Sequence, residues 1–145
     1  MAVVGPGDAR PADVELAEAV GRELAERGAV VVCGGLGGVM EAACRGAKEA
    51  GGATLGILPG HDRAEANRHV DMAVATGLGE ARNALVVRAA DALVAVGGAY
   101  GTLSEIALAL KVGKPVIGLG SWQIEGVRGA AGPVPAVEAA LGSLA

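Results

Sequence analysis

Short apolar runs alternate along this chain with longer segments whose apolar residues recur at helical spacing. In residues 13–27 the aliphatic side chains fall on one face of a helix and the charged ones on the other, and Gly28 ends the pattern. Residues 29–33 and 91–96 are instead short and rich in valine and alanine, which is typical of strands buried on both faces. The alternation predicts an α/β fold: a single doubly wound, mainly parallel, Rossmann-like sheet with helices on both faces.

The same pattern gives bounds for the elements. The predicted strands are residues 2–4, 29–33, 53–58, 91–96 and 115–119, with a short further strand at 71–75. The predicted helices are residues 13–27, 39–50, 80–90, 102–112 and 133–141, and the pattern weakens between 120 and 133. A chain of 145 residues suits one hydrophobic core, so we expect a single nucleotide- or phosphate-binding domain over residues 1–145.

The charge balance argues against a nucleic acid partner. The formal net charge is −4, and the 12 lysines and arginines are spread along the chain, whereas binding to DNA or RNA needs clustered basic residues. No apolar run approaches the roughly 20 residues of a membrane span, and the first residues lack the pattern of a signal peptide. We therefore expect no membrane partner and a cytoplasmic location.

The cysteines and histidines do not form a pattern typical of a metal site. Cys33 and Cys44 are too few for a disulfide framework and have no Cys or His at ligand spacing, so we expect buried free thiols. His61 and His69 lie in the polar loop of residues 59–70, where no helix or hairpin fixes a ligand spacing. A metal site there is conceivable, but the sequence favours none.

Two glycine-rich turns carry the candidate chemistry. GGLGG (residues 34–38) and GGAYGT (residues 97–102) each follow a predicted strand and open a predicted helix. Such a turn directs free backbone N–H groups and the positive end of the helix dipole at an anion, and glycine permits both positive φ and close approach. The alternative is that both are ordinary tight turns. Neither is a P-loop nor a G-x-G-x-x-G fingerprint, and no acidic residue follows at the distance that holds a ribose, which disfavours NAD and ATP hydrolysis.

Three segments together resemble one known superfamily. GGLGGVMEAA (residues 34–43), EARNALVVRAADALVAVGG (80–98) and GGAYGTLSEIALAL (97–110) match its GG-x-x-G-x-M segment, its Arg-led helix and its PGG-x-GT-x-x-E segment. The chain thus resembles the LONELY GUY or "lysine decarboxylase-like" Rossmann-like proteins. Asn83, Val86 and Val96 replace the Lys, Met and Pro of the cytokinin-activating members. The sequence looks more similar to the molybdenum-cofactor carrier branch, whose members bind a phosphate-bearing pterin.

The resemblance also implies a functional pair. Arg82 and Glu105 occupy the positions that act in the phosphoribohydrolase members, where an arginine fork can hold phosphate and a carboxylate can stabilise an oxocarbenium-like centre. Each has a structural alternative. Glu105 can close a T-x-x-E capping box with Thr102, and Arg82 can be a solvated residue at an exposed helix start, with or without a tie to Glu80.

Two functions from different classes remain open, with a purely structural oligomer as a third. The first is a binding or carrier protein for a molybdopterin-type cofactor or purine nucleotide, and the second is a nucleoside 5′-monophosphate phosphoribohydrolase. Pyridoxal phosphate chemistry is not expected, because Lys48, Lys111 and Lys114 fall on predicted helix surfaces and a turn. The predicted ligand-binding residues are Gly34, Gly35, Gly37, Gly38, Arg82, Asn83, Gly97, Gly98, Gly101 and Thr102.

Two aromatic residues and the oligomeric state complete the expectations. Tyr100 either stacks on a base or pterin or only caps its turn, and Trp122 is expected to be a packing residue, at a subunit contact. We expect a homodimer, because apolar surface on helices such as residues 106–110 would be buried against a second copy.

Overall fold

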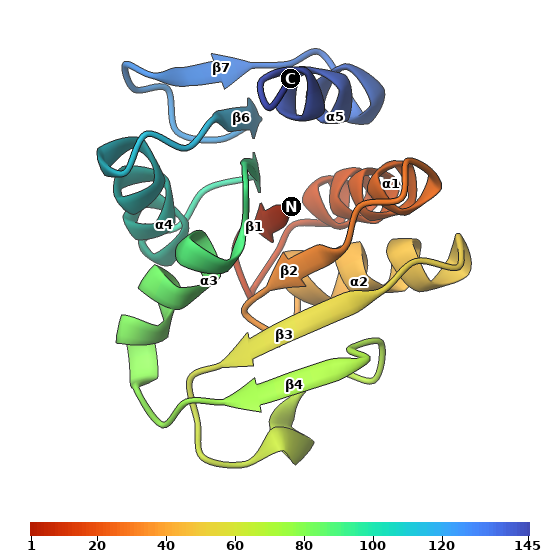
Figure 1. Cartoon of the computed structure of the whole chain (residues 1–145), viewed down its shortest axis with the longest axis vertical. Coiled ribbons are helices and arrows are strands. Elements are labelled where there is room, and N and C mark those ends of the chain that lie inside the picture. Colours follow the sequence, from red (N-terminus) through yellow and green to blue (C-terminus); the bar gives the residue numbers. More distant parts are fainter.

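The computed structural model describes residues 1–145 and contains one seven-stranded sheet in the order β4-β3-β2-β1-β5-β6-β7 (Figure 1). All six strand pairings are parallel. The strands are β1 Ala2–Val4, β2 Val31–Cys33, β3 Thr54–Leu58, β4 Met72–Ala75, β5 Leu93–Val96, β6 Val116–Leu119 and β7 Val127–Gly129. The predicted doubly wound parallel sheet is confirmed.

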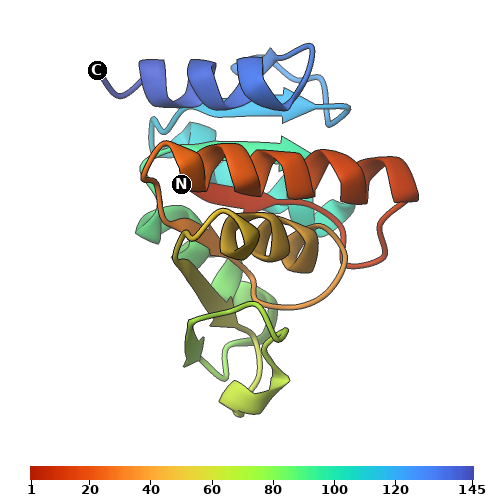
Figure 2. The same ribbon diagram turned by 90° about the vertical axis from the view of Figure 1, so that its right-hand side faces the viewer.

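Helices cover both faces of this sheet, as predicted. The helices are α1 Pro11–Glu26, α2 Val39–Glu49, α3 Asn83–Ala89, α4 Tyr100–Lys111 and α5 Pro133–Gly142, with short 3₁₀ turns η1 Arg63–Glu65 and η2 Gly79–Arg82. Figure 2 shows α1, α2 and α5 side by side on one face, and α3 and α4 lie behind the sheet. No helix combines the length and the apolar composition that crossing a bilayer requires.

Two aliphatic cores separate the sheet from its helices. Successive residues of a strand point to opposite faces, so Val3 packs under α1 and α2 while Ala2 and Val4 pack under α3 and α4. Helices α1 and α2 approach closely because Gly21 of α1 and Gly46 of α2 each face the backbone of the other helix. A Cβ on Gly21 would lie 2.0 Å from the carbonyl oxygen of Ala43, which leaves no room for a side chain.

Three predicted bounds were wrong in ways that matter for the site. Helix α1 begins at Pro11 rather than at residue 13, because proline is accommodated in the first helical turn. The predicted helix at 80–90 is divided into η2 and α3, with the break at Arg82. Helix α4 begins at Tyr100 rather than at Thr102, and strand β7 was missed because an exposed edge strand carries only a weak apolar pattern.

The chain reverses its winding between β1 and β5. From β1 the sheet grows through β2, β3 and β4 to one side, and β5, β6 and β7 extend it on the other. Ligands of open α/β sheets bind at such a switch point, beyond the carboxyl ends of the strands. The segments that follow β1, β2 and β5 all reach this edge.

Candidate functional site

A cavity of about 200 Å³ lies at the switch point, between the turn after β1 and the start of α4. We call it the inner cavity. Its walls come from the Gly5–Pro6–Gly7 turn, from α2, from the η2–α3 junction and from the first turns of α4. The residues lining it are Gly5, Pro6, Gly7, Met40, Arg82, Asn83, Ala99, Gly101, Thr102 and Glu105.

The amino end of α4 forms one wall of the inner cavity. Gly97 adopts a φ of +65°, which turns the chain sharply out of β5, and Ala99 is the N-cap residue. The first N–H groups of a helix have no partner within the helix and carry the positive end of its dipole. Thr102 lies in this first turn, is 2% exposed, and its buried Oγ1 has no hydrogen-bond partner. An unpaired buried hydroxyl is costly, so this group is suited to a ligand oxygen.

The capping-box interpretation of Glu105 was wrong. Because α4 begins two residues earlier than predicted, Thr102 lies inside the helix and the N-cap makes no side-chain hydrogen bond. The carboxyl of Glu105 faces the inner cavity instead and forms no hydrogen bond or ion pair with another side chain. Burial raises the pKa of Glu105 to about 7, against the opposing effect of the positive charge of Arg82.

Arg82 is a buried residue and not a solvated one, which corrects the second alternative. Its Nε donates to the carbonyl of Ile57 at 2.9 Å, its Nη2 to the carbonyl of Gly34 at 3.3 Å, and its Nη1 to Oδ1 of Asn83. No ion pair joins it to Glu80, because the helix break at Arg82 turns the side chain inward beneath β2 and β3. Three of the five N–H groups of a guanidinium are thereby used.

Asn83 links the two helices that meet at the cavity. Its Nδ2 donates to Oγ of Ser104 at 3.0 Å, and that hydroxyl donates to the carbonyl of Gly101 at 2.7 Å. The side chains of Arg82 and Asn83 therefore hold β2, β3, α3 and α4 in one hydrogen-bonded network. Burial lowers the pKa of Arg82, although the charges of Glu105 and Cys33 oppose this effect.

The turn of residues 34–38 lies behind the inner cavity. A Cβ on Gly38, whose φ is +64°, would lie 2.4 Å from the carbonyl oxygen of Pro6. The carbonyl of Gly35 accepts hydrogen bonds from the backbone N–H of Asn67, at 2.8 Å, and from its side chain. Gly34, Gly35, Gly37 and Gly38 line no part of the cavity, so their contact with a ligand stays a prediction.

Arg82, Asn83, Gly101 and Thr102 do come together with Glu105 in the inner cavity. Two parts of the cavity were not among the predicted site residues: the Gly5–Pro6–Gly7 segment and Met40, although Met40 is the methionine of the GG-x-x-G-x-M match. The signal for the first was available, because the segment directly follows the first strand and contains two glycines. A Cβ on Gly5 would lie 2.5 Å from the carbonyl oxygen of Val96, so this turn packs against the end of β5.

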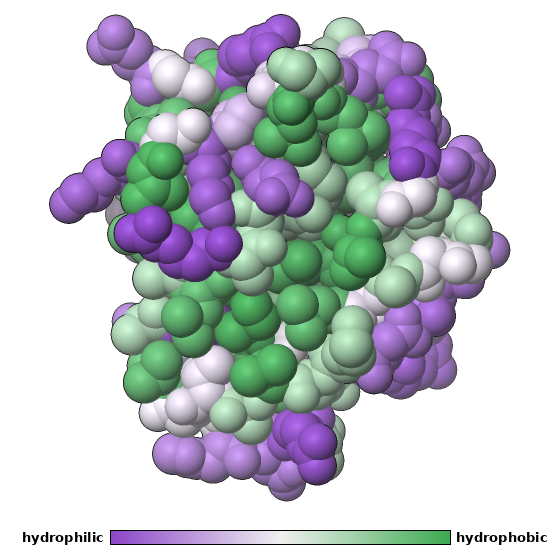
Figure 3. Space-filling view, viewed as in Figure 1, coloured by the Kyte–Doolittle hydropathy of each residue, from purple (hydrophilic) through white to green (hydrophobic).

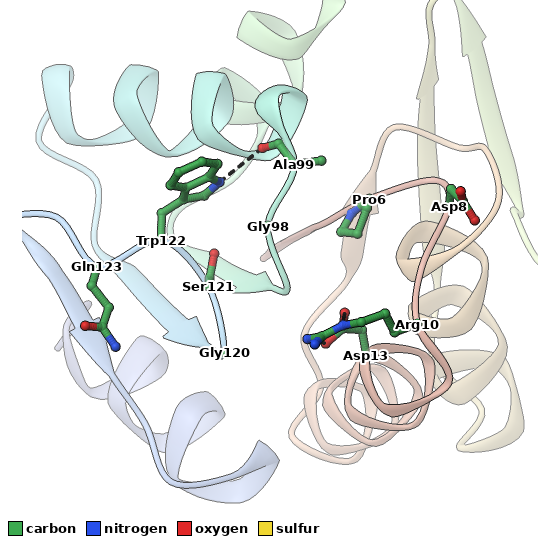
Figure 4. Close-up of a pocket in the computed structure, with 10 residues that line it drawn as sticks. All are labelled: Pro6, Asp8, Arg10, Asp13, Gly98, Ala99, Gly120, Ser121, Trp122 and Gln123. Atoms are coloured by element: carbon green, nitrogen blue, oxygen red, sulfur yellow. Dashed lines mark hydrogen bonds and ion pairs between the residues drawn. The ribbon is translucent and has the colours of Figure 1, made fainter.

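A larger cavity of about 590 Å³, the outer cavity (Figure 4), shares Pro6 and Ala99 with the inner cavity as lining residues. It separates the start of α1 from the segment after β6. Its lining residues are Pro6, Asp8, Arg10, Asp13, Gly98, Ala99, Gly120, Ser121, Trp122 and Gln123. Of the predicted ligand-binding residues, Gly98 lines this outer cavity. Gly97 does not line it but lies against Asp13, which does.

Trp122 has fixed surroundings in the outer cavity. Its Nε1 donates to the carbonyl of Ala99 at 3.1 Å. The ring of Tyr100, which is 84% exposed, stacks on it with centroids 6.2 Å apart. Part of the expected packing role of Trp122 is therefore fulfilled within its own chain. Its indole packs against Tyr100 at the start of α4.

The remaining candidate residues lie away from both cavities. Cys33 and Cys44 are buried and free, as predicted, with their Sγ atoms 3.5 Å apart. The hydrogen bond between the two thiols lowers the pKa of Cys33 and, together with burial, raises that of Cys44. The chain assembles no group of three His, Cys, Asp or Glu side chains with metal-binding geometry. Lys114 caps α3 by donating to three carbonyl groups, which include that of Val87 at 2.7 Å.

Comparison with solved structures finds proteins of known structure that share this fold. The molybdenum cofactor binding protein of Rippkaea orientalis matches with a TM-score of 0.94 and 39% identity, over 99% of this chain and 96% of that one. The molybdenum cofactor carrier protein of Chlamydomonas reinhardtii matches with a TM-score of 0.90 and 38% identity, over 99% and 95%. DNA processing protein A of Helicobacter pylori, at 22% identity and a TM-score of 0.75, shares the fold alone.

Sequence comparison gives the family. An uncharacterized protein of Archaeoglobus fulgidus is 47% identical over 119 residues, which cover 82% of this chain and 78% of the relative. Residues 1–135 match the model of the SLOG cluster4 family. The resemblance to the LONELY GUY-related proteins and to their molybdenum-cofactor carrier branch is confirmed. The chain belongs to the SLOG cluster4 family.

Proposed function

We propose that this protein binds and carries a phosphate-bearing small molecule, with a molybdopterin-type cofactor as the preferred ligand. The observation that carries the proposal is the unpaired, buried Oγ1 of Thr102, at the amino end of a helix and in the same cavity as Arg82. A phosphate there accepts hydrogen bonds from the first N–H groups of α4 and from the threonine hydroxyl. The guanidinium of Arg82 supplies positive charge.

The chemistry of Glu105 suits an anion that is bound and released. An ionised carboxylate would repel phosphate, whereas a protonated one can donate a hydrogen bond to it. A pKa of about 7 leaves Glu105 partly protonated at neutral pH. The inner cavity therefore accommodates phosphate most readily when Glu105 holds a proton.

Solved relatives support the choice of ligand. The structures from Rippkaea orientalis and Chlamydomonas reinhardtii are of a molybdenum cofactor binding protein and a molybdenum cofactor carrier protein, and each is similar to this chain over 99% of its length. When bound, such a cofactor would supply a terminal phosphate for Thr102 and the start of α4. A purine nucleotide offers the same phosphate and remains the second ligand to test.

A phosphoribohydrolase is the alternative, and one observation favours it. Arg82 and Glu105 line the same cavity, and a carboxyl with a pKa of about 7 can protonate a leaving base. Glycosidic cleavage generally uses two carboxyl groups, one as acid and one as base or nucleophile. Glu105 is the one carboxyl residue that lines the inner cavity, which favours binding without turnover.

The test combines binding with product analysis. Equilibrium dialysis measures the affinity for a purified molybdopterin-type cofactor and for AMP, and chromatography after long incubation with AMP detects free adenine. We expect cofactor binding and no adenine. Thr102→Val should weaken binding about tenfold, the value of one hydrogen bond to a charged group, and Thr102→Ser should retain it. Absence of binding to wild-type protein contradicts the proposal, and adenine release that disappears in Glu105→Ala establishes the hydrolase instead.

A further inference from the structure

Resting on the proposed function, we infer that the outer cavity binds the flat heterocycle of the same ligand whose phosphate lies in the inner cavity. The inner cavity, at about 200 Å³, is below the roughly 300–1,000 Å³ of pockets that enclose a whole small-molecule ligand. The outer cavity, at about 590 Å³, is within that range. Pro6 and Ala99 line both cavities, so the cavities adjoin there, and one elongated ligand that lies across these two residues would occupy both.

Two glycines leave space in the outer cavity. Gly98 and Gly120 line it and present no side chain to it. A Cβ on Gly98 would lie 3.1 Å from Nε1 of Trp122, tighter than ordinary van der Waals contact. Gly97 is needed beside them, because a Cβ there would lie 2.8 Å from Oδ2 of Asp13.

Trp122 gives the outer cavity an aromatic wall that is already in place. Its hydrogen bond to Ala99 and its contact with Tyr100 fix the ring before any ligand arrives. A rigid aromatic side chain contributes contact area and stacking at little cost in conformational entropy. This wall suits a planar heteroaromatic ring.

The polar groups of the outer cavity determine which hydrogen-bonding groups a bound ring must carry. Oγ of Ser121 is buried and has no protein partner, so it is available to a ring nitrogen or carbonyl. Asp13 is 3% exposed and accepts two hydrogen bonds from Arg10, at 3.0 and 3.1 Å. Each carboxylate oxygen retains a further acceptor site. In Figure 4 these two groups lie on opposite sides of the outer cavity, so a ring held between them would present an N–H donor to Asp13 on one edge and an acceptor to Ser121 on another, as pterin and guanine can.

The test compares two probes that share a phosphate and differ in the ring. Titration calorimetry measures wild-type affinity for 6-hydroxymethylpterin monophosphate and for methyl phosphate. We expect the pterin to bind at least tenfold more tightly. Ser121→Ala and Trp122→Leu should each reduce the pterin affinity by about five- to tenfold and leave the affinity for methyl phosphate unchanged. Ser143→Ala, which removes a hydroxyl at the C-cap of α5 that bonds to Arg128 and Ala139, should change neither affinity.

Two results would overturn the inference while leaving the proposed function standing. One is equal affinity of wild-type protein for both probes, and the other is wild-type pterin affinity in both variants. Failure of both probes to bind overturns the proposed function together with this inference. Urea unfolding of each variant, followed by circular dichroism, verifies that any loss of affinity occurs in folded protein.

Discussion

Arg82 and Glu105 line the same cavity, yet no guanidinium nitrogen lies within 4.0 Å of a carboxylate oxygen. The guanidinium is held by the carbonyls of Ile57 and Gly34, on two neighbouring strand ends. The carboxyl has no such partner. The two groups therefore influence each other through their charges alone, and a ligand can enter without first breaking an ion pair.

The raised pKa of Glu105 predicts that the protein loses stability as pH rises. The pKa is about 7 in the folded protein and 4.5 in the unfolded reference, so the folded state binds more protons between these values. The stabilisation is complete below pH 4.5 and lost as pH rises through about 7, a change on the order of 3 kcal/mol. Urea unfolding at several pH values measures it. Glu105→Gln should show a smaller loss over this window, and equal losses in both proteins would contradict the prediction.

Anion binding should follow the same titration. Sulfate keeps its charge across neutral pH, so its affinity reports the protonation of the protein. We expect sulfate to bind wild-type protein more weakly above pH 7 than below it, because ionised Glu105 repels it. Calorimetric titrations at pH 6 and pH 8 measure the difference, and Glu105→Gln should reduce it. A pH dependence that is unchanged in the variant would assign the titration to another group.

Arg82→Lys should destabilise the protein by about 2–4 kcal/mol. A lysine has no fork with which to bond both Ile57 and Gly34, so at least one buried carbonyl loses a partner. Arg88→Lys, on the exposed face of α3, is the matched control and should change stability by less than about 0.5 kcal/mol. Both values come from urea unfolding. Equal stability of the two variants would show that the bonds of Arg82 contribute little.

Gly97→Ala should cost more than the same change at another glycine of similar conformation. Gly97 and Gly113 have φ values of +65° and +74°, where alanine is strained by about 1 kcal/mol. A Cβ on Gly113 meets nothing within 4 Å, whereas on Gly97 it would lie 2.8 Å from Asp13. We expect Gly97→Ala to cost about 1–3 kcal/mol beyond Gly113→Ala. Thermal unfolding of both variants measures the two losses of stability. Equal losses would mean that Asp13 moves freely to admit the Cβ.

Much of the fold was predictable because valine runs and helical periodicity directly report which faces are buried. Strand β7 was not, since Arg128 and Gly129 are exposed and carry no apolar signal. The protein partners of Arg82 were equally hidden. The sequence marked Arg82 as a candidate ligand residue and left a solvated helix start as the alternative, and only the tertiary arrangement brings the carbonyls of Ile57 and Gly34 within reach. The pattern of apolar residues identifies helices and strands. It does not identify the partners of a buried charge, because these lie at strand ends that are distant in sequence.

The location of apolar surface changes the expected homodimer interface. Ile106 and Ala109, on the helix expected to supply that surface, lie in the core, whereas Met72 and Val74 on edge strand β4 are 56% and 48% exposed. Figure 3 shows an apolar area on the face of the molecule that includes β4. Exposed apolar edge strands favour association, so Val74→Glu should shift a wild-type dimer toward monomer in sedimentation experiments. Val134→Glu, on α5, should remain dimeric, and a monomeric wild-type protein at micromolar concentration would refute the homodimer.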